Sequence, residues 1–466
     1  MNKYKTLLKD TSIFALGSIA SKAIIFFLVP LYTNCLSAEA YGIADLVFTI
    51  AQLIIPFLSL VIFDGVVRYG LMYRDNPQDV LLVGIFVWGV GCIVLLCISP
   101  FLHKISSVGE WSSYLCVYIM INILLSIELN YLKVKDKNMI YALISIVQTA
   151  SLAFSNIILL LKLDMGIQGY LLANIFAQIV AVVMATFLGK IIPDLKISHF
   201  NKKVAKEMIV YSSPLILNNL SWWVVQSSDK LMVEVMVSAA ALGLYTVACK
   251  IPSLISVFVS VFQQAWGISS IKEMDSTNDS QFYTKILNTL YVFACSACLF
   301  LILIIKPFMR IYASGDGYES AWKLVPLLLV SAVFSAISAF YGSMYGALKK
   351  SLNNMYSTLC SAIANIVVNF VAIKLCGVMG AVIGTLIAYI VLAAVRMIDV
   401  NRFVKFQIGV SKFIVNGILL VLNGICVSLD FYGYLSSVIC ILIFLVINGS
   451  DLKELLTGIY KLLIKK

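Results

Sequence analysis

The sequence predicts an all-α polytopic membrane protein with about 14 transmembrane helices, each long enough to cross a hydrocarbon core of about 30 Å. Of the 466 residues, 61% are hydrophobic and 12% are charged, and the mean hydropathy is +0.98. A soluble domain carries roughly 25% charged residues. In addition, the first half of the chain recurs in the second, which predicts two parallel six-helix repeats followed by two further helices.

The repeat is clearest in two stretches that align without a gap. Ser37–Ile54 reads SAEAYGIADLVFTIAQLI, and Ser238–Ile255 reads SAAALGLYTVACKIPSLI. Each copy predicts a short polar turn that opens a long apolar helix, with one helix before it. Six helices per repeat is an even number, so both halves enter the membrane from the same side. Matched glycines recur at Gly42/Gly243, Gly166/Gly377 and Gly169/Gly380.

The apolar runs define the expected spans in chain order. They lie near 11–33, 43–63, 80–102, 112–132, 139–161, 167–192, 211–233, 242–262, 286–305, 324–346, 355–375, 378–398, 412–428 and 431–449. The expected parts are an N-terminal half (1–207), a C-terminal half (208–405), two additional transmembrane helices (406–450) and an amphipathic cytoplasmic tail (451–466). The tail carries leucines on one helical face and lysines on the other, which predicts a helix on the membrane surface.

The net charge of +11 comes from lysines and arginines that gather in every second loop. Such a bias marks the cytoplasmic side of a membrane protein and predicts that both termini are cytoplasmic. Basic loops account for the charge without a nucleic-acid partner.

Several chemistries have no sequence signature. The chain has no G-x-x-x-x-G-K-[ST] motif for ATP. His103 and His199 stand apart from other ligand residues, and the CxxC at Cys295 and Cys298 has no second pair. Free cysteines in apolar runs behave as small buried hydrophobes. We therefore expect no enzyme activity, no metal site and no resident cofactor.

Ionisable groups at membrane depth are costly and are candidates for function. Lys22 and Lys250 fall midway along the first and eighth expected spans, and Asp45 lies one turn into the second. Asp229 lies toward the outer end of the seventh span. The two lysines are candidates for substrate binding, and the two aspartates are candidates for ion coupling. In the alternative, Lys22 snorkels to the interface and Lys250 only neutralises one of the aspartates.

The seventh span carries a polar stripe of Asn219, Trp222, Gln226 and Lys230 at helical spacing. Such a stripe is unsuited to lipid, so it lines a wet cavity or pairs with other helices. We count all four residues as substrate-binding candidates. Charged residues near span ends are instead expected to be interfacial anchors; these are Arg68, Glu128 and Arg396.

Three stretches resemble a known family: FALGSIASKAIIFFLVPLYTNCLSAEAYGIADL (Phe14–Leu46), FDGVVRYG (Phe63–Gly70) and YLKVKDKNMIYALISIVQTASLAFSNIILL (Tyr131–Leu160). Together with the two six-helix halves, the chain resembles the multidrug/oligosaccharidyl-lipid/polysaccharide (MOP) exporter superfamily. Within it, the chain most resembles the Wzx-type polysaccharide flippases.

The resemblance implies that the protein moves an undecaprenyl-pyrophosphate-linked oligosaccharide across the bacterial cytoplasmic (inner) membrane by alternating access. In such families a basic cavity receives the diphosphate, a role that Lys22 and Lys250 fit, with Arg68 assisting on the cytoplasmic side. H⁺ or Na⁺ would couple through Asp45 or Asp229. Membrane lipids, a polysaccharide polymerase and glycosyltransferases are the implied partners.

Three alternatives remain open. A multidrug antiporter of the MATE type shares the fold, but the mid-span lysines would repel a cationic drug. A lipid II flippase also uses basic cavity residues, although the first span holds only Lys22 and no arginine cluster. A non-transporting subunit of a glycan-synthesis complex is disfavoured by the polar seventh span.

Overall fold

A computed structural model describes residues 21–73, 76–105, 107–196, 200–259, 280–348, 350–405 and 409–464. The secondary structure of these residues is helical, and twelve of their helices are long and apolar enough to cross a membrane. The expected all-α polytopic fold is confirmed. The first expected span lies partly outside the described residues and continues as the apolar helix Ser21–Cys35. The seventh expected span is also a helix, but its polar residues keep it out of the set of twelve long apolar helices.

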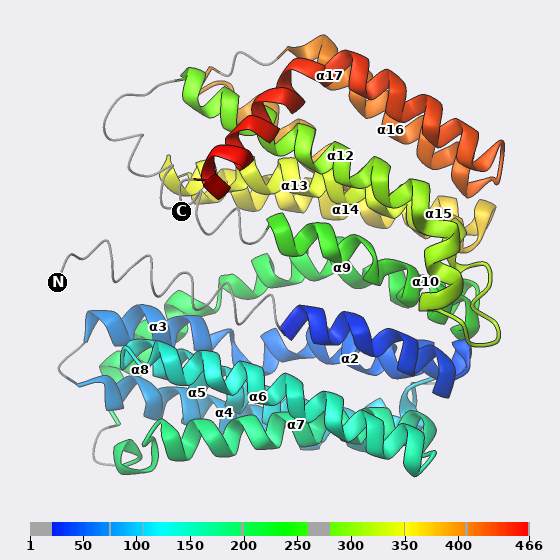
Figure 1. The fold of residues 1–466 in the computed structure, drawn as a ribbon. Coiled ribbons are helices and arrows are strands. Elements are labelled where there is room, and N and C mark those ends of the chain that lie inside the picture. Colours follow the sequence, from blue (N-terminus) through cyan, green and yellow to red (C-terminus); the bar gives the residue numbers. More distant parts are fainter. Residues whose placement is uncertain are drawn as a thin grey trace. The chain divides into compact units, whose positions relative to one another are not determined.

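The chain forms two compact units. One comprises Met1–Trp223 and Ser238–Gly243, and the other comprises Val224–Val237 and Leu244–Lys466. In the first unit, α4 packs against α5, and α7 packs against both α5 and α6 (Figure 1). Its helices are α2 (Ala38–Ser59), α3 (Ile62–Met72), α4 (Pro77–Leu102), α5 (Ser112–Val134), α6 (Asn138–Asn156), α7 (Gly166–Leu188) and α8 (Lys202–Ser212).

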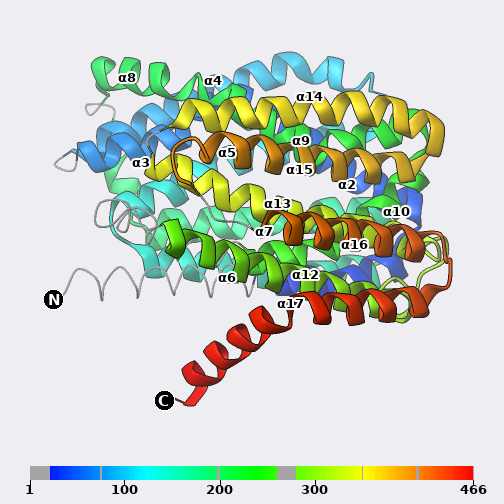
Figure 2. The ribbon, with the colours of Figure 1, turned by 90° about the horizontal axis from the view of Figure 1, so that it is seen from above.

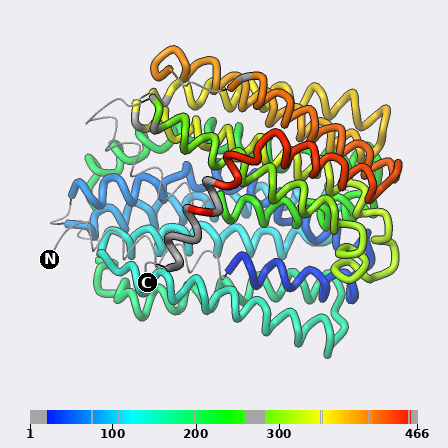
Figure 3. Tube along the Cα trace, turned by 45° about the horizontal axis from the view of Figure 1, so that its top comes forward, coloured from blue at the N-terminus to red at the C-terminus, as the bar shows by residue number. Residues whose placement is uncertain are grey.

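The second unit is built around α13, α14 and α15, which lie side by side (Figure 2). The hairpin of α16 and α17 packs against α12 (Figure 3). The helices from α9 onward are α9 (Leu215–Met236), α10 (Ala239–Lys250), α12 (Ser280–Tyr312), α13 (Val325–Ala347), α14 (Ser351–Cys376), α15 (Val378–Val400), α16 (Val410–Ser428) and α17 (Gly433–Ile464). The apolar span that starts with α10 runs to Val259.

The polar turn predicted for each repeat copy is a helix N-cap. The Ser37 hydroxyl accepts a hydrogen bond from the backbone N–H of Ala40 at 3.2 Å. In the second copy, the Ser238 hydroxyl accepts the same bond from Ala241 at 3.1 Å. A serine in this position satisfies one of the N–H groups that a helix start leaves without a partner. The same local chemistry therefore starts α2 and α10.

The matched glycines of the two copies bring their helices into close contact. A Cβ on Gly42 would collide with the backbone carbonyl of Ala239, and one on Gly243 would collide with the carbonyl of Ala38. The relation is reciprocal, as the repeat implies. Small residues allow membrane helices to approach at backbone distance. These glycines are therefore required by packing between α2 and α10.

We expect Gly243→Ala to lower the melting temperature and the yield of the detergent-solubilised protein. The added methyl group meets the rigid Ala38 backbone, and overpacking of this kind costs about 1–3 kcal/mol. Gly89→Ala in α4 is the matched control, because no described atom lies within 4 Å of its added Cβ. Equal melting temperatures for the two variants would contradict the close approach.

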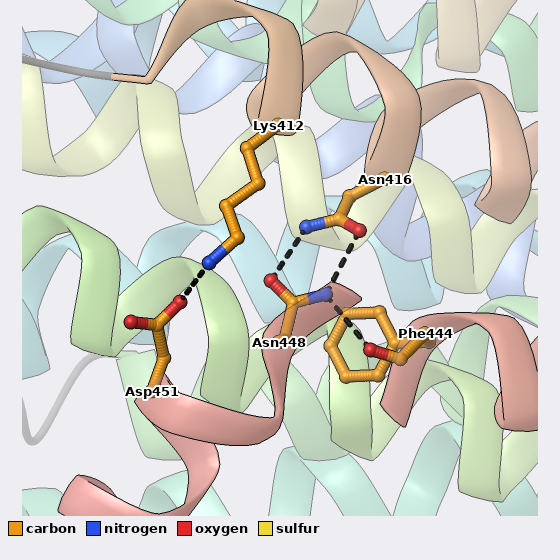
Figure 4. Close-up of polar contacts among 5 residues, drawn as sticks. All are labelled: Lys412, Asn416, Phe444, Asn448 and Asp451. Carbon is orange, nitrogen blue, oxygen red and sulfur yellow. Dashed lines mark hydrogen bonds and ion pairs between the residues drawn. The ribbon is translucent and has the colours of Figure 1, made fainter. Parts of the chain in front are cut away.

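A polar clasp joins α16 to α17 (Figure 4). The amides of Asn416 and Asn448 are fully or almost fully buried and exchange two hydrogen bonds of 3.0 Å. Nearby, Lys412 Nζ lies 2.6 Å from a carboxylate oxygen of Asp451. Asn448 has φ −113° and ψ 15°, so the helix is interrupted there, and the part that follows turns away from the other helices (Figure 2).

A double-mutant cycle tests the clasp. Asn416→Ala removes both hydrogen bonds that the buried Asn448 amide makes with Asn416. Asn448→Ala likewise removes both bonds from the Asn416 amide. Polar pairs between membrane helices are worth about 0.6 kcal/mol on average and up to about 1.7 kcal/mol, and we expect a coupling energy near the upper figure because the bond is reciprocal. Unfolding free energies of the four proteins in detergent measure it, and strictly additive effects would contradict the pairing.

Candidate functional site

Asp229 is a buried carboxylate in α9, with 2% of its surface exposed. Its Oδ2 accepts hydrogen bonds from the hydroxyl of Tyr245 on α10 and from the hydroxyl of Thr385 on α15, the latter at 2.9 Å. Its Oδ1 accepts the backbone N–H of Lys230 at 2.8 Å. A buried carboxylate needs such donors because desolvation of a charge is costly. Three helices of the second unit therefore meet at this side chain.

Two fully buried asparagines of α14 extend the cluster. Asn365 Oδ1 accepts hydrogen bonds from the Ser228 hydroxyl and from Asn369 Nδ2, both at 3.0 Å. Asn369 Oδ1 accepts no hydrogen bond from any residue that the structure describes. Gly384 leaves the space for this oxygen, because a Cβ there would collide with it.

The two groups are linked through chain neighbours: Asn365 bonds to Ser228, which precedes Asp229 on α9, and Asn369 lies against Gly384, which precedes Thr385 on α15. We call Asp229, Tyr245, Asn365, Asn369 and Thr385 the oxygen cluster. It combines one carboxylate with neutral oxygens, and hard cations prefer such ligands. Within the described residues, the acceptor Asn369 Oδ1 and the donor Asn365 Nδ2 have no hydrogen-bond partner. The acceptor is suited to a cation or a proton.

Two further predicted residues, Lys230 and Lys250, lie in the region of Asp229. Cys249 is within electrostatic range of Asp229, Lys230 and Lys250. The side chains of Lys230 and Lys250 are half-buried, and Gln226 is exposed. The structure thus brings one aspartate and two lysines of the predicted set into one region.

In the first unit, the predicted residues are dispersed. Lys22 is exposed on the helix Ser21–Cys35, and Trp222 is half-buried. Asn219 Nδ2 donates to the carbonyl of Leu215 in its own helix at 3.0 Å. Asp45 is 7% exposed and lies within electrostatic range of Tyr170, in a group of tyrosine rings.

Arg68 is exposed, as expected for a residue near a span end, and its guanidinium carbon lies 4.3 Å from the centre of the Tyr211 ring. The hydroxyl of Tyr73, one turn further along, donates to Glu207 at 2.8 Å. This hydrogen bond is the main reason that the pKa of Tyr73 is raised.

Two charged residues differ from the interfacial anchors that we expected. Glu128 is 4% exposed, and its Oε1 accepts the hydroxyl proton of Thr186 at 2.7 Å. Arg396 is 1% exposed. Neighbouring helices supply partners that a single sequence does not reveal: a donating hydroxyl for Glu128 and acceptor oxygens for Arg396. Arg396 donates to Ser338 O, Asn354 Oδ1, Ser357 Oγ and Thr358 Oγ1 at 2.6–3.1 Å.

The fold and these buried ionisable groups define a polytopic α-helical membrane protein with polar sites inside its spans. Solved structures share this fold. A lipid II flippase, MurJ, in an inward closed conformation superposes with a TM-score of 0.67 and 15% identity, over 95% of this chain and 99% of MurJ. An inward-facing MATE multidrug resistance transporter of the MOP superfamily gives 0.63 and 13%, over 86% and 96%. These superpositions confirm the expected fold.

The chain belongs to the family described as Polysaccharide biosynthesis protein, whose profile matches residues 7–267. Two proteins of Haemophilus influenzae are more distant relatives. An uncharacterized membrane protein is 23% identical over 265 residues, and Lsg locus putative protein 1 is 21% identical over 269 residues. These matches cover 56% and 55% of this chain, and 64% of the length of each relative.

Proposed function

We propose that the protein is a secondary-active flippase. It moves undecaprenyl-pyrophosphate-linked oligosaccharide repeat units across the bacterial cytoplasmic membrane, by alternating access, for surface polysaccharide synthesis. One observation carries the proposal: the residues that match the polysaccharide biosynthesis family, 7–267, include Lys22 and Lys250, the two lysines that the sequence predicts midway along spans.

A diphosphate that leaves water for a low-dielectric interior needs cationic partners, because unpaired charge there is strongly penalised. Lysine supplies a compact point charge with three donors. We assign Lys22 and Lys250 to the diphosphate, with Lys230 as a further cation. Asn219, Gln226 and Trp222 would contact sugar hydroxyls and ring faces.

We assign ion coupling to the oxygen cluster, with Asp229 as its charged member. An ion can shift a conformational equilibrium only if it binds one state more tightly than the other. Asp229 accepts hydrogen bonds from groups on α9, α10 and α15, and the two asparagines of the cluster lie on α14. Any movement of these helices relative to one another therefore changes the distances between the oxygens of the cluster. Na⁺ or H⁺ would bind there; Asp45 is the second candidate.

A multidrug antiporter is the second candidate function, and the buried Asp229 favours it. A carboxylate attracts cationic drugs as well as coupling ions. The two membrane-depth lysines weigh against it, since like charges disfavour a cationic substrate.

A deletion strain separates the two functions. We expect lipid extracts to accumulate one undecaprenyl-pyrophosphate oligosaccharide by mass spectrometry, with loss of the surface glycan and full recovery from a plasmid copy. Unchanged lipid intermediates together with a new sensitivity to cationic drugs would overturn the flippase proposal in favour of the antiporter.

A further inference from the structure

The stretch FDGVVRYG forms part of α3, whose side chains meet those of α8. Tyr69 stacks with Tyr73 at a ring-centre distance of 6.2 Å and meets the Tyr211 ring edge-to-face at 5.9 Å. Arg68 covers the Tyr211 ring at 4.3 Å. We call Tyr73, Tyr69 and Tyr211 the tyrosine row; the guanidinium lies at one end of it.

Backbone geometry fixes this arrangement. Leu60 and Val61 both have left-handed φ values, 50° and 53°, and they separate α3 from α2. An added Cβ on Gly65 would lie 2.7 Å from the Ser212 hydroxyl of α8, and one on Gly70 would lie 2.6 Å from Val134 of α5. Two glycines thus allow α8 and α5 to approach α3 from different sides. The close packing holds Tyr69 against Tyr211.

The row is open to solvent at its charged end. Arg68 and Asp64 are exposed, and the three tyrosine rings are half-buried. Arg68 forms no ion pair or hydrogen bond with any residue in the described part of the chain. The contact with the Tyr211 ring leaves the N–H donors of Arg68 available to an external acceptor.

We propose that this face binds the head group of a glycosyl-diphosphate lipid. A planar guanidinium donates two parallel hydrogen bonds to phosphate oxygens. Aromatic rings offer flat apolar surfaces against which the C–H faces of a sugar can pack. The carboxylate of Glu207, which accepts from Tyr73 at the other end of the row, also accepts from sugar hydroxyls. This inference rests on the proposed function and names an initial binding site at the end of the first unit where basic loops predict cytoplasm.

Binding to the full-length protein in nanodiscs tests the site. The probes are undecaprenyl pyrophosphate with its oligosaccharide, extracted from the deletion strain, and undecaprenyl pyrophosphate alone. We expect Arg68→Gln to weaken both by about tenfold, the value of one charge-assisted contact. Tyr211→Leu should weaken the glycosylated lipid by about fivefold more than the unglycosylated lipid, and Tyr211→Phe should retain binding because the ring remains.

Lys202→Gln is the matched control, because Lys202 is an exposed cation of α8 outside the row. An equal loss in Lys202→Gln and Arg68→Gln would reduce the effect to nonspecific charge and overturn the inference. Wild-type affinity in Arg68→Gln and Tyr211→Leu would also overturn it while leaving the flippase intact. If the wild-type protein bound neither lipid, the proposed function would fail and the inference with it.

Discussion

Asp229→Asn is expected to abolish the dependence of transport on an ion gradient while the protein still folds and reaches the membrane. Asparagine keeps the size of the side chain and its acceptor toward Thr385, but it removes the only carboxylate of the oxygen cluster. The remaining oxygens are neutral and hold a cation weakly. Coupling free energies are about 1–3 kcal/mol, so we expect a loss of about 5- to 150-fold in gradient-driven transport.

Thermal stability in NaCl and in choline chloride, at two pH values, measures ion binding directly. The wild type should melt higher in the presence of its coupling ion, because a ligand that binds only the folded state stabilises it. Asp229→Asn should lose this shift. Asp430→Asn is the control, since Asp430 forms an exposed ion pair with Lys306, and it should keep the shift. A full shift in Asp229→Asn would remove the cluster from the coupling mechanism.

Joint replacement of Lys22 and Lys250 by alanine is expected to eliminate surface polysaccharide without loss of the protein from the membrane. Each lysine provides a charge-assisted contact worth about 1.5–3 kcal/mol. Losing both would therefore cost at least about a hundredfold in diphosphate affinity. Lys22 is exposed and Lys250 half-buried, so the substitutions leave the apolar packing largely intact.

Two measurements test this prediction: the amount of polysaccharide on the cell surface and the amount of each protein variant in the membrane. The Lys22→Arg, Lys250→Arg protein should restore display in part, because the charge is retained. Lys104→Ala with Lys162→Ala is the control, since both lysines lie at the ends of apolar helices. Normal polysaccharide in the double alanine variant would contradict the assignment of these lysines.

The arrangement of spans was predictable because uninterrupted apolar length is a local property of the sequence. The N-caps at Ser37 and Ser238 were equally local. The polar content of α9 indicated a special helix, and Asp229 was a candidate on depth alone. Its surroundings were not predictable, because Tyr245 and Thr385 come from distant parts of the chain.

Partners from distant parts of the chain also explain why Glu128 and Arg396 are buried and do not lie at the interface as expected. Position near a span end suggested that Glu128 and Arg396 anchor at the interface. Both are buried against partners on other helices: Thr186 donates to one carboxylate oxygen of Glu128, and Asn354 is among the acceptors of Arg396. The asparagines of α14 carry no charge and no motif. Their spacing of four residues places both on one face of the helix, and this is the only sequence signal of the pair.

Reconstituted flipping is the most direct test of the central claim. Purified protein would be placed in liposomes that contain the extracted undecaprenyl-pyrophosphate oligosaccharide, and a membrane-impermeant glycosidase or lectin would report the fraction of glycan exposed outside. The account predicts that exposure rises under an imposed Na⁺ or H⁺ gradient with the wild type and stays at the protein-free level with the Lys22→Ala, Lys250→Ala variant. Equal exposure with and without protein, under either gradient, would contradict it.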